Sequence, residues 1–176
     1  MNNPVLLENL RCIPDFPKKG INFRDVTTLY KNPECMKIMV DEMYELYKDK
    51  GITKIVGIES RGFVMAAALA TKLGAGVVLA RKPGKLPATV IKESFSKEYG
   101  VDTVEMHIDS IDENDVVLIH DDLLATGGTA KATLKLVNHF HPKKVYMNFI
   151  IEITDEGLHG RGCLEKDVEV TTLMVI

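Results

Sequence analysis

The sequence has no tryptophan, and aromatic residues make up only 6% of its 176 residues. Its three cysteines, Cys12, Cys35 and Cys163, are odd in number, far apart and without C-x-x-C spacing. This usage argues against a disulfide framework or a structural zinc site and favours a reducing, cytoplasmic environment. Because the five histidines show no H-E-x-x-H or similar spacing, no tightly held metal ion is expected either.

A strong charge of one sign and long apolar runs are also missing. The formal net charge of −3 gives no reason to expect nucleic acid or an anionic membrane as a partner. No apolar run approaches the roughly 20 residues of a membrane span, and Glu8, Arg11 and Asp15 leave no signal-peptide core near the start. Internal repeats and low-complexity tracts are not found. With 45% hydrophobic residues, the chain is expected to form one domain, residues 1–176, with a real core.

What the sequence does contain is an alternation of short apolar segments with helical ones. Strands are expected at 54–58, 76–80, 116–120 and 145–151. Helices are expected from Asn32 to about Gly51, at 63–73 and at 129–140. Continuously apolar strands joined by helices predict an α/β fold, with a central, mostly parallel sheet flanked by helices.

Two segments depart from this alternation. Apolar and polar residues alternate from Val104 to Asp109, which predicts a half-exposed antiparallel strand with Glu105 on its exposed side. Its expected partner lies near 89–95, so a hairpin arm of about residues 83–109 should project from the sheet as a flexible lid. Residues 1–30 precede the first strand–helix unit and are expected to form a small cap over one end.

The most informative segment runs from 116 to 137. A buried strand ends in Asp121 and Asp122, and a tight loop then opens a helix. The loop consists of Ala125, Thr126, Gly127, Gly128 and Thr129. At the carboxyl end of a parallel strand, such glycines and free helix N–H groups suit a phosphate. It is neither a Walker A loop, since no lysine follows, nor a dinucleotide fingerprint, since the acids precede the glycines.

The paired acids make this signal more specific. Two carboxylates beside a phosphate would repel it unless they bind something else. Ribose hydroxyls donated to Asp121 and Asp122 would satisfy them, and Mg²⁺ nearby would offset the remaining charge. A ribose 5-phosphate is the predicted ligand; the alternative is a strand–turn–helix with an exposed acidic N-cap.

This run resembles the phosphoribosyl pyrophosphate (PRPP) motif of the type I phosphoribosyltransferases, and DDLLATGGT resembles its adenine-specific version. Further segments resemble other family motifs in the family's order: 13–25, 57–63, 81–87 and 95–100. The resemblance extends from about residue 13 to 153. It implies the fold of that family, with arm and cap, and a purine-salvage reaction in which adenine displaces pyrophosphate from PRPP to give AMP. Mg²⁺ and a homodimer are implied by the family alone.

The resemblance also implies residue roles. Residues 125–129 would hold the 5-phosphate, and Asp121 and Asp122 the ribose hydroxyls. Pyrophosphate would be held by Glu59, Ser60, Arg61, Arg81, Lys82 and Lys85. A cis peptide, as in relatives, is expected at Glu59–Ser60. The base pocket would include Asn22, Phe23, Arg24 and Ile153. The expected catalytic group is Glu98 on the arm, with Tyr99 beside it, exchanging a proton with the purine under a closed lid.

Other interpretations remain open at this point. Taken singly, Arg61 could be an exposed arginine on a turn, residues 81–87 a solvated basic loop, and Glu98 a surface residue. The nearest rival function is the same fold acting on xanthine or hypoxanthine. A PRPP-sensing regulator would need a DNA-binding module, which the chain does not offer, and a kinase or phosphatase would need further phosphate or metal ligands. His120 departs from the aliphatic residue usual in relatives and could perturb Asp121.

Overall fold

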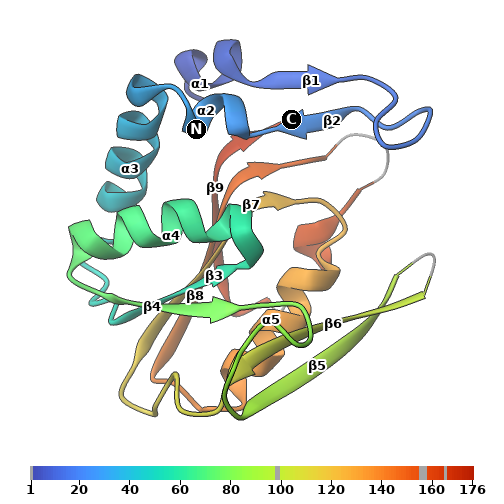
Figure 1. The fold of residues 1–176 in the computed structure, drawn as a ribbon. Coiled ribbons are helices and arrows are strands. Elements are labelled where there is room, and N and C mark those ends of the chain that lie inside the picture. The colour runs from blue at the N-terminus through green and yellow to red at the C-terminus, as the bar shows by residue number, and fades with distance from the viewer. Residues whose placement is uncertain (1, 98–99, 155–157, 165) are drawn as a thin grey trace.

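The centre of the molecule is a sheet of five parallel strands in the order β4-β3-β7-β8-β9 (Figure 1). The computed structural model describes residues 2–97, 100–154, 158–164 and 166–176. In chain order the strands of the sheet are β3 (Lys54–Ile58), β4 (Gly76–Ala80), β7 (Val116–Leu124), β8 (Lys144–Glu152) and β9 (Glu169–Val175). The parallel sheet and its flanking helices confirm the predicted α/β architecture.

Four of these strands lie where the continuous apolar runs predict them. β3 and β4 have the predicted bounds, and β7 and β8 extend past theirs at the carboxyl end. The extension of β7 carries both acids into the strand itself. β9 was not predicted, because Thr171 and Thr172 interrupt its apolar run.

Three longer helices cover the sheet: α3 (Pro33–Tyr47), α4 (Glu59–Leu73) and α5 (Gly128–Asn138). α3 begins as predicted, because the Asn32 side chain accepts hydrogen bonds from the first N–H groups and Pro33 fills the first helical position. α4 begins four residues earlier than predicted, directly after β3. The E-S-R-G segment is therefore the first turn of a helix. In the described part of the chain, no helix is long and apolar enough to cross a membrane.

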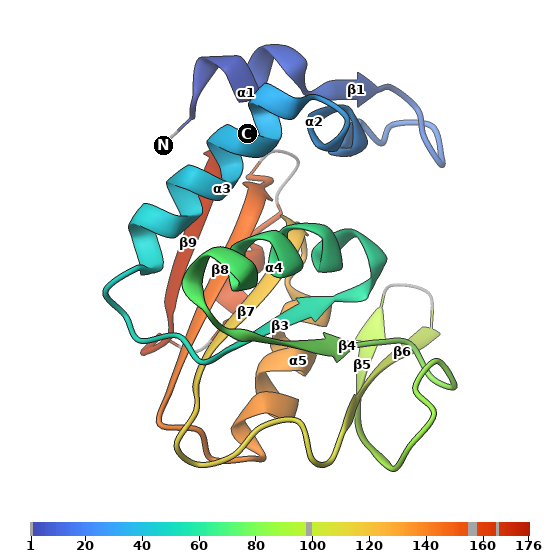
Figure 2. The same cartoon turned by 60° about the vertical axis from the view of Figure 1, so that its left-hand side comes forward.

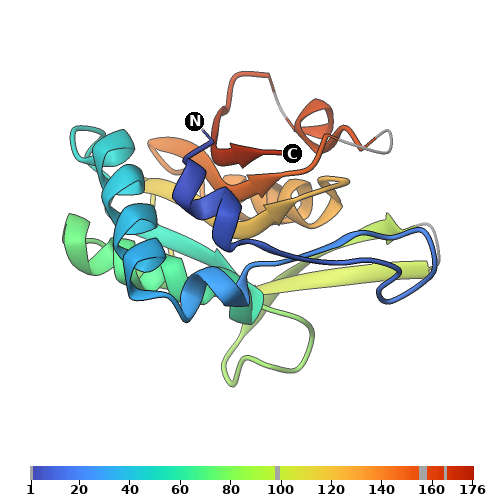
Figure 3. The ribbon, with the colours of Figure 1, turned by 90° about the horizontal axis from the view of Figure 1, so that it is seen from above.

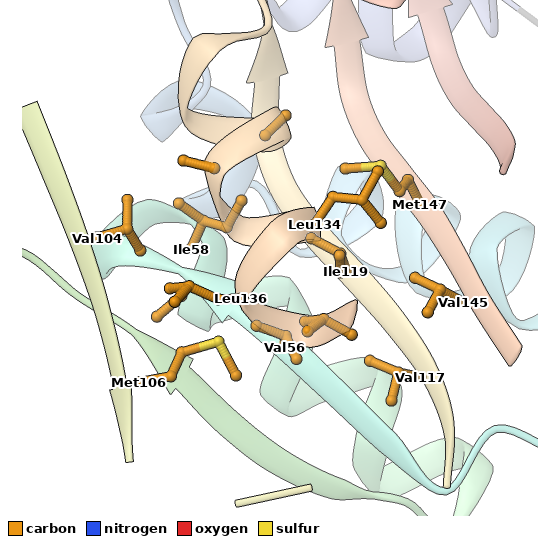
Figure 4. Packing of buried hydrophobic residues seen from close by; sticks show 14 of the residues in the cluster. Val56, Ile58, Val104, Met106, Val117, Ile119, Leu134, Leu136, Val145 and Met147 are labelled. Carbon is orange, nitrogen blue, oxygen red and sulfur yellow. The ribbon is translucent and has the colours of Figure 1, made fainter. Parts of the chain in front are cut away.

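The helices lie on opposite faces of the sheet (Figures 2 and 3). On one face, Met39 of α3 and Leu69 of α4 pack with Leu118 of β7. On the other, α5 and the arm cover the strands, and Figure 4 shows side chains of this second cluster. Its labelled members are Val56, Ile58, Val104, Met106, Val117, Ile119, Leu134, Leu136, Val145 and Met147. Both faces of β7 are thus buried, which explains its continuous apolar sequence.

The N-terminal segment forms the expected cap. It consists of α1 (Pro4–Asn9), β1 (Arg11–Ile13), β2 (Phe23–Asp25) and α2 (Thr27–Tyr30). β1 and β2 pair antiparallel, and an ion pair joins Arg11 to Asp25. Figures 1 and 3 show this segment at the end of the sheet where β7, β8 and β9 finish. The cap therefore lies at the carboxyl ends of the strands, the edge that binds ligands in such sheets.

The predicted arm is a hairpin of β5 (Val90–Lys97) and β6 (Gly100–His107), paired antiparallel. The expected exposure of its side chains is wrong at two places. Glu105 is only 8% exposed, whereas Ile108 is 49% exposed. Glu105 is buried because β6 also makes an antiparallel bridge to Arg81, at the end of β4. A simple two-residue alternation cannot report such a second partner.

The loop between β7 and α5 is fixed by a close approach of two glycines. Gly127 has a left-handed backbone with φ of +80°, and a Cβ there would lie 2.5 Å from the carbonyl oxygen of Gly160. Gly160 begins the short 3₁₀ helix η2 (Gly160–Cys163). A Cβ on Gly160 would lie 2.4 Å from the Ala125 carbonyl oxygen. Neither position has room for a side chain, so η2 supports the loop from behind.

A buried polar chain runs from His120 to α3. His120 is fully buried, and its Nδ1 lies 3.0 Å from Oδ1 of Asn148. Asn148 Nδ2 donates to Thr171 Oγ1 at 2.9 Å, and the Tyr47 hydroxyl lies 2.6 Å from the same oxygen. Since an amide oxygen only accepts, Nδ1 of His120 carries the hydrogen. Burial lowers the pKa of His120 to about 4, so the ring is neutral near pH 7 and places no charge beside Asp121.

This burial predicts a pH-dependent contribution to stability. The ordinary pKa of a histidine is 6.5, and that of the folded His120 is about 4. Between these two pH values, His120 binds a proton in the unfolded chain but not in the folded one. The contribution of His120 therefore lowers the free energy of unfolding by about 2 kcal/mol when the pH falls from 7.5 to 5.0. Urea unfolding of the unmodified protein and of His120→Leu at both pH values measures it. On acidification, the free energy of unfolding of the unmodified protein should fall by about 2 kcal/mol more than that of the variant. Equal decreases would contradict the assignment of a neutral, buried His120.

The glycine contact predicts unequal effects of two alanine substitutions. Gly51 has φ of +67° and open space around a Cβ, so Gly51→Ala carries only the left-handed penalty of about 1 kcal/mol. Gly127→Ala adds the clash with Gly160 and should destabilise the fold by at least about 2 kcal/mol more. Urea unfolding of both variants makes the comparison. Similar losses would mean that η2 does not constrain the loop.

Candidate active site

A cavity of about 320 Å³ opens where β3 and β7 end and α4 and α5 begin. Six parts of the chain contribute to it: the end of β3, the first turn of α4, the end of β4, the arm, the acid pair and the start of α5. The lining residues are Ile58, Glu59, Ser60, Arg61, Ala80, Arg81, Lys82, Phe95, Asp102, Thr103, Val104, Asp121, Asp122 and Thr129. Residues as far apart in sequence as Ile58 and Thr129 therefore meet at the predicted edge of the sheet.

The acid pair lies at the floor of this cavity. Asp122 is 1% exposed, and its Oδ2 is 3.0 Å from Nη1 of Arg61. Asp121 is half-buried, and its Oδ1 accepts the backbone N–H of Asp122 at 2.8 Å. α4 packs closely here, since a Cβ on Gly62 would lie 3.0 Å from the His120 carbonyl oxygen. The exposed acidic N-cap considered from the sequence is thus wrong.

Burial acts on both carboxyls, and repulsion by Asp122 acts in addition on Asp121. Burial, followed by the negative charge of Asp122, raises the pKa of Asp121. Burial also raises the pKa of Asp122, while the Arg61 guanidinium opposes that rise. Two adjacent carboxylates in a poorly solvated place are unfavourable when both are charged. Uncharged hydrogen-bond donors stabilise them without adding further negative charge. A diol is such a donor.

The phosphate loop borders a second, smaller cavity of about 170 Å³ that shares the acid pair and Arg61 with the first. All five predicted loop residues, 125–129, line it. Gly127 is the N-cap residue of α5, so the free N–H groups of the first helical turn begin there. The helix start, with the Thr126 and Thr129 hydroxyls, offers donors for an anion.

The predicted pyrophosphate ligands are only partly brought together. Arg61, Arg81 and Lys82 line the main cavity, whereas Lys85 is exposed and is not among the described lining residues. The Arg81 guanidinium lies over the Phe63 ring at 5.3 Å, with Nε 3.6 Å from Oε1 of Glu59. Within the described residues, buried Nε of Arg81 has no hydrogen-bond acceptor. Because Arg81 also lines the cavity, its positive charge is suited to an anionic ligand.

The expected cis peptide at Glu59–Ser60 is wrong. Among the described residues the only cis peptide is Phe16–Pro17, and Glu59 instead has φ of +48°. A left-handed residue makes the sharp turn from β3 into α4 without a cis bond. The Glu59 side chain points to the basic loop, where Oε1 accepts the backbone N–H of Lys82 at 2.7 Å. Its contact is thus with the cations and backbone that surround the cavity.

The predicted base-pocket residues lie near the cavity edge or away from it. Phe23 of the cap faces Arg61, whose guanidinium carbon is 5.8 Å from the ring centre, and Tyr30 donates to the Arg61 carbonyl oxygen at 2.9 Å. Arg24 Nη1 lies 2.8 Å from Cys12 Sγ, Asn22 is exposed, and Ile153 follows β8 with its N–H on the Leu124 carbonyl. None of these four predicted residues is among the described lining residues.

Sequence reasoning missed some residues of the site, and the arm carries most of them. Asp102, Thr103 and Val104 of β6 line the main cavity together with Phe95 of β5. Their place at the cavity depends on the pairing of the hairpin, which the sequence shows weakly. The predicted catalytic pair, Glu98 and Tyr99, lies outside the described residues. Its role therefore stays a prediction.

Comparisons with known proteins agree with this geometry. The phosphoribosyl transferase domain family matches residues 25–166. An adenine phosphoribosyltransferase of Phocaeicola vulgatus is 61% identical over 176 residues, covering 100% of both chains. Among solved structures, the adenine phosphoribosyltransferase of Rhodothermus marinus has a TM-score of 0.92 and 46% identity, covering 98% of this chain and 97% of its own.

The Saccharomyces cerevisiae adenine phosphoribosyltransferase has a TM-score of 0.88 and 37% identity, covering 97% of each chain. That structure contains adenine and an imino-altritol bisphosphate. The family match spans most of the chain, and the similarity at 61% identity extends over all of it. The chain belongs to the phosphoribosyltransferases and, within them, to the adenine phosphoribosyltransferase family.

Proposed function

We propose that this cleft transfers the 5-phosphoribosyl group of PRPP to adenine, forming AMP and releasing pyrophosphate. The observation that carries the proposal is the buried acid pair, Asp121 and Asp122, between the start of α5 and the cations Arg61, Arg81 and Lys82. A ligand with a phosphate, a diol and a polyphosphate in that order matches this arrangement. The yeast relative, with adenine and a bisphosphate in its structure, supports the same pairing of ligands.

The proposed reaction breaks the bond from the anomeric carbon to a pyrophosphate oxygen and forms one to a ring nitrogen of adenine. Its transition state is oxocarbenium-like, with negative charge growing on the leaving group. Arg61, Arg81 and Lys82 border the cavity where that charge would develop, and Lys85 lies farther along the same loop. Fixed cations stabilise such charge without having to reorganise.

Substrate alignment would come from the two ends of the sugar phosphate. The 5-phosphate would accept donors of residues 125–129 at the start of α5, and the diol would donate to Asp121 and Asp122. Ribose held at both ends presents its anomeric carbon to the cations on one side and to the base on the other. Holding the ribose in this way keeps the reacting atoms close together and oriented, which lowers the entropic part of the activation barrier.

The base would bind under the cap. Phe23, with Arg61 against its ring, offers an apolar wall on which a purine can stack. Asn22, Arg24 and Ile153 are proposed as its neighbours on the ground of the family resemblance. They are not among the described lining residues of either cavity, and we propose that the base side is completed when substrate binds.

The arm would act as the lid. Phe95, Asp102, Thr103 and Val104 already contribute its inner side to the cavity. In the sequence, Glu98 and Tyr99 stand between β5 and β6, and we propose them as the proton-exchanging group and its neighbour. Exclusion of water is required because water would otherwise attack the same carbon.

Mg²⁺ is the proposed cofactor. In the described part of the chain no three His, Cys, Asp or Glu side chains are grouped to hold an ion. The residues of the site fit an ion that is bound mainly by substrate oxygens and water, with the carboxylates of Asp121 and Asp122 nearby. When bound it would neutralise charge on the pyrophosphate.

A homodimer and a cytoplasmic location complete the proposal. Apolar side chains Val64 of α4 and Val77 and Leu79 of β4 are 38–42% exposed and offer a surface for a second copy. A solution mass of one chain, 19.6 kDa, would contradict the dimer. Three free thiols, Cys12, Cys35 and Cys163, fit a reducing compartment, which fractionation of the source cells would test.

The most direct test of the proposed function is base selectivity. Pyrophosphate release is followed with PRPP and Mg²⁺ in the presence of adenine, hypoxanthine, guanine, xanthine or orotate. Release with adenine alone is expected, because the chain belongs to the adenine phosphoribosyltransferase family and we propose Phe23 as a wall of its base pocket. Release with another base would contradict the proposed base specificity and the role given to the cap. Binding of PRPP without release of pyrophosphate would contradict the catalytic activity.

Glu98→Ala tests the proposed proton-exchanging group. The variant should lower kcat by about 100-fold, the ordinary contribution of a general acid or base, while the dissociation constant of PRPP changes little. Lys92→Ala, an exposed position on the same arm, is the control and should keep full turnover. Unchanged kcat in Glu98→Ala would remove Glu98 from the mechanism.

A further inference from the structure

The basic loop from Arg81 to Gly84 is fastened to the rest of the molecule by two glutamates. We infer that Glu105, buried at the base of the arm, is a positioning residue that holds this loop in its pyrophosphate-binding conformation, with Glu59 as the second fastening. The inference rests on the proposed function, because it assigns the loop to the pyrophosphate end of the substrate. It gives a role to a residue that sequence reasoning placed on an exposed surface.

The first fastening is at the distal end of the loop. Oε2 of Glu105 accepts the backbone N–H of Gly84 at 3.1 Å. Main-chain bonds join Glu105 to Arg81 in both directions, at 2.9 and 2.7 Å. One residue of the arm thus bonds to both ends of the segment 81–84.

The second fastening comes from the start of α4. Glu59 Oε1 accepts the backbone N–H of Lys82 at 2.7 Å and lies 3.6 Å from Nε of Arg81. Loop and arm are therefore linked to the strand–helix turn that carries Ser60 and Arg61. Arg81 and Lys82 therefore both interact with Glu59, while Arg61, from the same turn, pairs with Asp122.

Glu105 is not suited to touch the ligand directly, whereas Glu59 lines the cavity. Glu105 is 8% exposed and, although Val104 and Thr103 line the cavity, Glu105 does not. A carboxylate near pyrophosphate would also repel it. Its observed acceptor role, by contrast, restrains a loop that Pro83 and Gly84, at φ of +75°, would otherwise leave with many conformations.

Restraint of this loop lowers the conformational entropy lost on binding. Arg81 and Lys82 already face the cavity before pyrophosphate arrives. Without the Gly84 bond, the cations must be ordered at the moment of binding, so affinity for the pyrophosphate end falls. Adenine affinity should be unaffected, because the cap carries the base side.

The deciding experiment combines proteolysis with kinetics on the full chain. Trypsin cleavage after Lys85 reports the mobility of the loop and needs no catalytic activity. Four proteins are compared, each with and without inorganic pyrophosphate and Mg²⁺: unmodified, Glu105→Leu, Glu105→Gln and Lys92→Ala. Gln keeps an acceptor oxygen, Leu removes it, and Lys92 is the cross-strand partner of Glu105, exposed and outside the fastening.

Loss of one hydrogen bond to the loop should speed cleavage after Lys85 about fivefold to tenfold in Glu105→Leu and raise its KM for PRPP by a similar factor. Its KM for adenine should change less than about twofold, and Gln and Lys92→Ala should stay within about twofold of the unmodified protein. If Glu105→Leu does not fold, Glu105→Ser, whose hydroxyl is too short to reach Gly84, carries the same expectation.

Three results would overturn the inference: unchanged cleavage in the variant without an acceptor, equally fast cleavage in Glu105→Gln, or equal rises in both KM values. Failure of the proposed function would appear differently. In that case the unmodified protein would release no pyrophosphate with adenine, and pyrophosphate would give its loop no protection from trypsin.

Discussion

The site depends on one electrostatic constraint, the presence of two adjacent carboxyl groups at the buried end of β7. Asp122 is almost wholly buried and is paired with Arg61 from the first turn of α4. Burial and repulsion raise the pKa of Asp121, so the pair is best satisfied by donors that bring no negative charge. This explains why the acids can lie between two sites for anions. The diol of a ribose 5-phosphate supplies those donors, and the anionic ends of the substrate are met by separate groups.

The surrounding backbone is shaped to keep those groups apart. Gly127 and Gly160 approach so closely that the α5 start is fixed in place, and the left-handed Glu59 lets α4 begin directly after β3. Arg61 thereby reaches Asp122 while Ser60 stays at the cavity. On the opposite wall, the bonds of Glu59 and Glu105 to the loop orient Arg81 and Lys82. Cations and acids are thus held by different elements, so each can be matched to one part of a long ligand.

The sequence predicted the parts of this arrangement that depend on local pattern. Apolar runs located β3, β4, β7 and β8, and the glycines after the acids located the phosphate loop. It did not predict what depends on contacts between distant segments. Glu105 looked exposed because its second neighbour, Arg81, lies 24 positions earlier. The turn at Glu59 was expected to use a cis bond, because a resemblance carries over geometry that this chain achieves with a positive φ. Gly160 gave no signal at all, since its role is only to approach Gly127.

The central claim, that Asp121 and Asp122 receive ribose hydroxyls, is tested most directly by binding of ribose 5-phosphate and 2-deoxyribose 5-phosphate. Titration calorimetry on the unmodified protein and on the Asp121→Asn, Asp122→Asn double variant compares the two ligands without any catalytic step. A hydroxyl donated to a charged acceptor contributes about 1.5–3 kcal/mol, so the unmodified protein should prefer the ribose ligand by about tenfold or more. The double variant should lose most of that preference. Equal affinity of the unmodified protein for both ligands would contradict the account.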